Sequence, residues 1–176
     1  MSQAALPWSS NDTAHWNALM DQGAQAHAIA DFGASHRWFL TARKLAEKGL
    51  QKACNCAHPS AMSEASVATV RHYAAAATNV ARNGRCWGRF ELCRSALEEG
   101  VEQLLPLMEN ERLPQAFRCA CRQHAQCLTR QLACHLNRGG ASEPAMRALL
   151  EPIIHRIDAT AGLAPVPERP QNERLH

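Results

Sequence analysis

Apolar residues recur along this chain at intervals of three and four, the spacing that places them on one face of an α-helix. The clearest stripe, with polar residues between its members, is Cys86, Phe90, Cys93, Leu97, Val101, Leu104 and Met108. No stretch alternates apolar and polar residues with a period of two, so the sequence gives no support for strands. The pattern predicts an all-α chain of about six helices.

Helix-breaking residues divide the periodic segments. The main breaks are the corner at Asp31-Phe32-Gly33, the loop 54–60 around Pro59, the stop at Asn83-Gly84 and the stop at 137–140. These breaks predict a first helix capped by Asn11 or Asp12, a second over about 34–52 and a third from Glu64 to Asn83-Gly84. They predict a fourth helix over about 85–108, a fifth through 117–136 and a sixth through 146–157. We therefore expect a flexible leader (1–11), one helical-repeat domain (12–162) and a disordered Pro-containing tail (163–176).

The corners after the odd-numbered helices fall near Ala30-Asp31, Gly84-Arg85 and Gly139-Gly140, at nearly equal spacing. Such a spacing is typical of an internal repeat. One hairpin cannot bury its apolar face alone, but stacked hairpins share a continuous core. The expected fold is three stacked antiparallel helical hairpins, as an α-solenoid or a compact right-handed superhelix.

The first unit resembles a tetratricopeptide repeat, in which a Gly, an aromatic corner and small residues recur at fixed places. The residues in register with that pattern are Gly23, Ala26, Ala30-Asp31-Phe32, Ser35, Phe39 and Ala42. The second unit follows it more loosely around Gly84-Arg85-Cys86, and the third more loosely again around Gly139-Gly140-Ala141. The family repeat has about 34 residues, so the second helices and connectors here are longer than the family's.

The resemblance implies a non-catalytic adaptor or chaperone that receives a peptide or another protein in a concave groove lined by the first helices. The positions that it places in this groove are Asn17, Met20, His27, Arg71, Thr78, Gln126 and Thr129. Exposed helix faces are polar in any case, so ordinary surface positions are the alternative interpretation, and core packing is the alternative for Met20.

Charge and composition narrow the class of partner. Arg and Lys exceed Asp and Glu by 19 to 16, a net charge of +3, and the arginines are scattered along the sequence, which argues against a nucleic-acid binder. No apolar run reaches the roughly 18 residues of a membrane span, and the N-terminus lacks the pattern of a secretory signal. We therefore expect a cytoplasmic protein.

Eight cysteines and nine histidines offer an alternative function, a zinc or copper site or thiol redox chemistry on a helical bundle. The loop residues Cys54, Cys56 and His58 alternate and can wrap one ion. Cys121, His124 and Cys127 follow at helical i,i+3 spacing. No C-x-x-C pair occurs, and in a cytosol the cysteines are expected to be reduced packing residues such as Cys86 and Cys93.

Motifs of catalysis are missing from the sequence. There is no glycine-rich phosphate loop, no nucleophile elbow and no His-Glu-x-x-His. The sequence therefore predicts a protein that is not an enzyme and needs no cofactor, unless the metal alternative holds.

Overall fold

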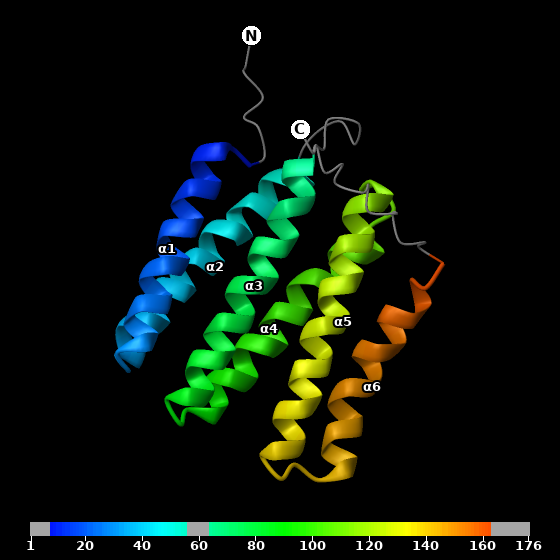
Figure 1. Ribbon diagram of the computed structural model, residues 1–176. Helices are drawn as coiled ribbons and strands as arrows, with labels where there is room; N and C mark the ends of the chain where they lie inside the picture. The colour runs from blue at the N-terminus through cyan, green and yellow to red at the C-terminus, as the bar shows by residue number, and fades with distance from the viewer. Residues whose placement is uncertain (1–7, 56–63, 163–176) are drawn as a thin grey trace, which may run out of the picture.

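The computed structural model describes residues 8–55 and 64–162, and this part of the chain is all helical, without strands. Figure 1 shows the six helices, which are α1 (Ser10–Ala28), α2 (Phe32–Cys54), α3 (Glu64–Cys86), α4 (Phe90–Glu109), α5 (Gln115–Arg138) and α6 (Glu143–Ala159). The all-α fold of helical hairpins is confirmed. The expected tail, 163–176, lies outside the described residues.

The helices form an open array rather than a closed bundle. Each helix packs against the next one in the chain, and α3 also packs directly against α5. In Figure 1, α1 and α6 lie at opposite ends of the array. Between the second and third hairpins, α3 packs against α5 more extensively than α4 packs against α6, so the first helices approach each other more closely than the second helices do.

The folded domain begins earlier than the sequence predicts. Ser9, rather than Asn11 or Asp12, caps α1, in a reciprocal capping box with the side chain and backbone of Asp12. Trp8 is only 5% exposed, and its indole Nε1 donates to Oγ1 of Thr13 at 2.7 Å. The expectation of a flexible leader as far as residue 11 is therefore wrong for residues 8–11, and residues 1–7 lie outside the described part.

The turn between α3 and α4 also differs from the prediction. Helix α3 continues through Gly84 to Cys86, and the residue in the left-handed conformation is Gly88, with φ of 74°. Gly84 is instead buried where α4 approaches, since a Cβ there would lie 3.0 Å from the backbone nitrogen of Cys93. Cys86 and Phe90 therefore do not extend the apolar stripe of α4, and both are exposed.

Small residues allow the helices to pack closely. Gly23 of α1 faces the ring of Phe39 on α2, and a Cβ at this glycine would lie 2.4 Å from Cε1 of that ring. Ala42, Ala46 and Ala77 are fully buried between helices. The abundance of alanine in the apolar positions thus sets short distances between neighbouring helices.

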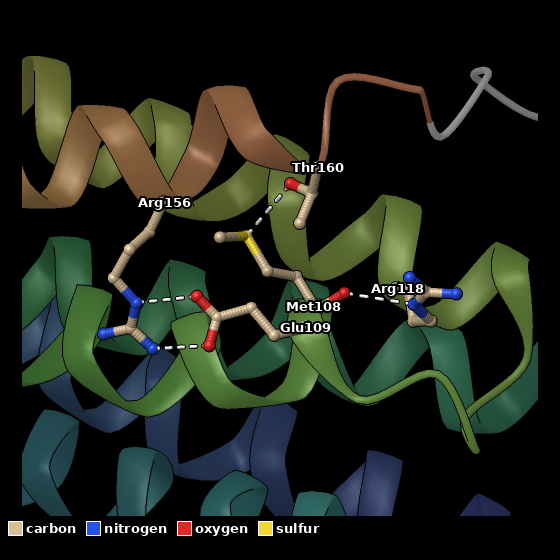
Figure 2. Close-up of polar contacts among 5 residues, drawn as sticks. All are labelled: Met108, Glu109, Arg118, Arg156 and Thr160. Carbon is tan, nitrogen blue, oxygen red and sulfur yellow. Dashed lines mark hydrogen bonds and ion pairs between the residues drawn. The ribbon is translucent and has the colours of Figure 1, made fainter.

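Helix α6 docks onto the end of α4 through polar contacts, which Figure 2 shows in close-up. Two of the three guanidinium nitrogens of Arg156, Nε and Nη2, donate to the two carboxylate oxygens of Glu109, each at 2.6 Å. The Thr160 hydroxyl lies 3.8 Å from the sulfur of Met108, whose carbonyl accepts a bond from Nε of Arg118 on α5. The C-terminal ends of α4 and α6 are thereby held together.

Candidate functional site

A pocket of about 300 Å³ lies between α3, α4 and α5. Its lining residues are Thr78, Ala81, Arg82, Arg85, Cys93, Leu97, Arg130, Gln131, Cys134, His135 and Arg138. It therefore lies between the first helices of the second and third hairpins, with α4 behind them.

Helical spacing explains which side chains reach this pocket. On α3, Thr78, Arg82 and Arg85 follow at i, i+4 and i+7 and so share one face. On α5, the residues from Arg130 to Arg138 that line the pocket recur over two turns of the helix. The floor is apolar, since Cys93 and Leu97 of α4 are buried.

The rim of the pocket is positively charged. Arg82, Arg85, Arg130 and Arg138 are all exposed, and no acidic residue lines the pocket. Among the described residues, none of these four arginines forms an ion pair with Asp or Glu. The pocket therefore holds a cluster of four positive charges without an acidic residue in its lining.

The floor and the walls of the pocket differ in their polar groups. Burial raises the pKa of the Cys93 thiol, and the nearby positive charge of Arg85 acts in the opposite direction. The amide Nε2 of Gln131 donates to Oγ1 of Thr78 at 3.3 Å, which joins α5 to α3 across the pocket. Cys93 is thus a neutral floor residue, and Gln131 and Thr78 fix the separation of the two walls.

An exposed aromatic residue adjoins one end of the pocket. Phe90, the first residue of α4, is 58% exposed, and its ring centroid lies 6.1 Å from that of the pocket residue His135. In the preceding turn the guanidinium of Arg89 lies 4.5 Å from the centre of the Trp87 ring, in a cation–π contact. The pocket therefore has an apolar surface beside its basic rim.

The residues that the resemblance places in a groove are spread over three helices. Thr78 lines the pocket. Asn17 and Arg71 are exposed, whereas Met20, His27 and Gln126 are half-buried, and Met20 packs against the core. Thr129 is buried and its hydroxyl donates to the carbonyl of Ala125 at 2.8 Å, so its assignment to an open groove surface is wrong.

The arginines of the pocket were not among the predicted site residues. In the sequence Arg82 and Arg85 lie some 50 residues from Arg130 and Arg138, and they look scattered. The sequence feature that could have indicated the site was the i, i+3 spacing of Arg82 and Arg85 at the end of the third predicted helix. Only the packing of α3 against α5 makes the two pairs one group.

The residues of the metal alternative lie on several helices. Burial raises the pKa of the Cys121 thiol on α5, and the charge of the Cys54 thiol at the end of α2 acts in the same direction. Burial lowers the pKa of His124, with a smaller contribution from Arg71. Cys127 is exposed and lies 3.5 Å from Nε2 of Gln131. Cys56 and His58 lie outside the described residues, within which no group of three or more metal-ligating side chains is assembled.

Comparison of the chain with protein-family models, with curated proteins and with solved structures gives no match. None of the helices in the described ranges has the length and apolar character to cross a membrane. The site must therefore be interpreted from its own geometry and charge.

Proposed function

We propose that this protein is a non-catalytic interaction module that binds a segment of another protein in the pocket between α3 and α5. The observation that supports the proposal is an apolar-floored pocket whose four rim arginines have no acidic partner among the described residues. Its volume of about 300 Å³ suits a few side chains of a partner segment. We place this function in the cytoplasm, where the cysteines remain reduced.

The chemistry of the rim favours binding over catalysis. Guanidinium groups remain charged at every accessible pH, so they bind and orient anionic groups but do not abstract protons. Thr78 and Gln131 on the walls are engaged with each other, the His135 ring lies 6.1 Å from the ring of Phe90, and Cys134 is exposed. Both walls of the pocket carry exposed side chains, Arg82 and Arg85 on α3 and Arg130 and Arg138 on α5, which a bound chain can reach.

Site-specific photo-cross-linking tests this proposal. Cys134 is exposed and lines the pocket, so a Cys134→benzoylphenylalanine variant carries the cross-linker at the site. One control carries the same residue at Lys44, which is exposed on α2, and a second carries it at Ile154, which is exposed in a separate hollow that Cys134 also borders. We expect illumination in a native extract to yield a discrete protein adduct at position 134 and not at positions 44 and 154. The same adducts at position 134 and at either control position, or none at 134, would contradict the proposal.

Metal or thiol chemistry is the second candidate function, and the electrostatic influence of the Cys54 thiol on that of Cys121 is the feature that favours it. Thiolates are soft ligands that select zinc or copper(I). If this function holds, protein purified without chelator will contain zinc or copper in near-stoichiometric amount, and Cys54→Ser will lose it. Equal metal content in the two proteins would reject Cys54 as a ligand.

A further inference from the structure

We infer that the segment bound between α3 and α5 is acidic and carries an aromatic or large apolar residue at one end of its acidic run. The inference rests on the proposed function and specifies the chemistry of its partner. It follows from the arrangement of charge along the pocket, from the grouping of four arginines without an acidic residue in the lining, and from the aromatic residue at the end of the pocket.

The arginines lie along the pocket and not at a single point. Arg130 and Arg138 are eight residues apart on α5, which corresponds to about 12 Å along a helix axis. An extended chain advances about 3.3 Å per residue, so this length matches an acidic run of about four residues. Carboxylates are the natural ligands, because a guanidinium donates two parallel hydrogen bonds to a carboxylate.

Four arginines outside the pocket have acidic partners, whereas others, such as Arg37 and Arg112, form no ion pair with Asp or Glu among the described residues. Arg43 pairs with Glu99, and Arg156 pairs with Glu109, and two further pairs lie within α4 and α6. The pocket instead brings four like charges together without an acidic residue, an arrangement that repels itself in the free protein. A bound polyanionic segment relieves that repulsion.

The aromatic end of the pocket supplies the second element of recognition. Phe90 is exposed and lies against His135, which lines the pocket together with Arg138. An aromatic or large apolar side chain of the partner can pack on this surface while the neighbouring acidic residues reach the arginines. Such buried aromatic contacts dominate the energy of many interfaces.

The surroundings of the pocket favour a peptide over a nucleic acid. Cys134 also lines a second, more open hollow of about 480 Å³, to which α6 contributes Glu143, Arg147 and Glu151, and Arg147 pairs with Glu143 at 2.9 Å. Glu151 has no ion pair among the described residues, and its carboxylate would repel a phosphate backbone that continued from the pocket across α5. The four rim arginines thus span the length of a short acidic segment.

Fluorescence anisotropy with labelled peptides tests the inference. The two main probes are eight-residue peptides of Glu and Asp that carry a single Phe, at the N-terminus in one and at the C-terminus in the other. Control peptides replace the Phe by Ala, or the Glu and Asp by Gln and Asn. An oligothymidylate of equal charge represents a nucleic acid. The protein variants are Arg130→Gln/Arg138→Gln and Phe90→Ser. The control is Arg37→Gln/Arg112→Gln, which removes equal charge at exposed arginines outside the pocket. Thermal unfolding verifies that each variant is folded.

We expect one acidic peptide with Phe to bind in a salt-dependent manner, and the pocket double variant to weaken it by about tenfold or more. The control double variant should change the affinity less than about twofold, because a distant exposed charge is screened. Phe90→Ser in the protein and Phe→Ala in the peptide should each weaken binding. The two changes combined should weaken it no more than either one alone, because each removes the same contact.

Equal binding of the Gln and Asn peptides, tighter binding of the oligothymidylate, or equal losses in the pocket and control variants would overturn the inference. The proposed function is judged separately by the cross-link at position 134. An adduct there that neither acidic peptide displaces would reject the acidic segment while leaving a protein-binding pocket in place.

Discussion

Oδ1 of Asn83 accepts a hydrogen bond from Nδ1 of His27 at 3.0 Å, which connects the end of α3 to the end of α1. The carbonyl oxygen of an amide can only accept, so Nδ1 of His27 carries the proton. Nδ2 of the same Asn83 donates to the carbonyl of Phe32 at 2.9 Å. A fully buried amide thus joins the second hairpin to both helices of the first one.

Replacing this amide should destabilise the protein. Asn83→Ala removes the hydrogen bonds to the Phe32 carbonyl and the His27 ring and the volume of a fully buried side chain, and we expect a loss of about 1–3 kcal/mol in the free energy of unfolding. Urea denaturation measures it. Asn79→Ala is the matched control, because the bonds of Asn79 lie within α3 itself, and it should cost less than about 0.5 kcal/mol. Equal losses would show that Asn83 does not join the hairpins.

The contact of Gly23 with Phe39 predicts a steric effect. In Gly23→Ala the new methyl would lie 2.4 Å from the buried Phe39 ring, and overpacking of this kind costs about 1–3 kcal/mol. Gly139→Ala is the control, since its φ is −75° and the nearest atoms to a Cβ there are 3.5 Å away. Thermal unfolding should show a lower midpoint for the first variant only. An unchanged midpoint in Gly23→Ala would contradict the close approach of α1 to α2.

The one tyrosine of the chain provides a direct test of burial by pH. Burial raises the pKa of Tyr73 to about 12, and its hydroxyl donates to the carbonyl of Glu99. The pKa rises on folding from an ordinary value of about 10, so this contribution to stability is complete below pH 10 and is lost as the pH rises toward 12. Absorbance at the phenolate band should show ionisation near pH 12 in the native protein and near pH 10 in urea. Ionisation near pH 10 in both would place Tyr73 at the surface.

The ion pair between Glu109 and Arg156 predicts an effect at acid pH. The bond from Arg156 holds the pKa of the Glu109 carboxyl below its usual range. The ion pair therefore contributes to the free energy of unfolding above about pH 4.3, the ordinary pKa of glutamate. This contribution is lost as the pH falls through the lower pKa that Glu109 has in the folded state. Both side chains are partly exposed, so we expect Glu109→Gln to cost less than about 1 kcal/mol at pH 7. The difference from wild type in urea unfolding should vanish at pH 2, and a difference that persists there would exclude the ion pair as its cause.

The periodicity of apolar residues predicted the six helices and their pairing into hairpins, because burial of one helix face requires that spacing. It placed the turn before α4 wrongly, since Cys86 and Phe90 continue the spacing of the stripe although the chain reverses between them. Only the contact of Gly84 with α4 and the left-handed Gly88 fix that turn. The arginine pocket could not be predicted in the same way, because it depends on the packing of α3 against α5.

The central claim is that the pocket between α3 and α5 is the binding site, and side-chain NMR tests it most directly. Arginine Nε–H signals are recorded while the unlabelled acidic peptide with Phe is titrated into the ¹⁵N-labelled protein. The account predicts that the signals of Arg82, Arg85, Arg130 and Arg138 shift together and saturate, while those of Arg37 and Arg112 remain in place. Saturable shifts at Arg37 and Arg112, or unchanged signals at the four pocket arginines, would contradict it.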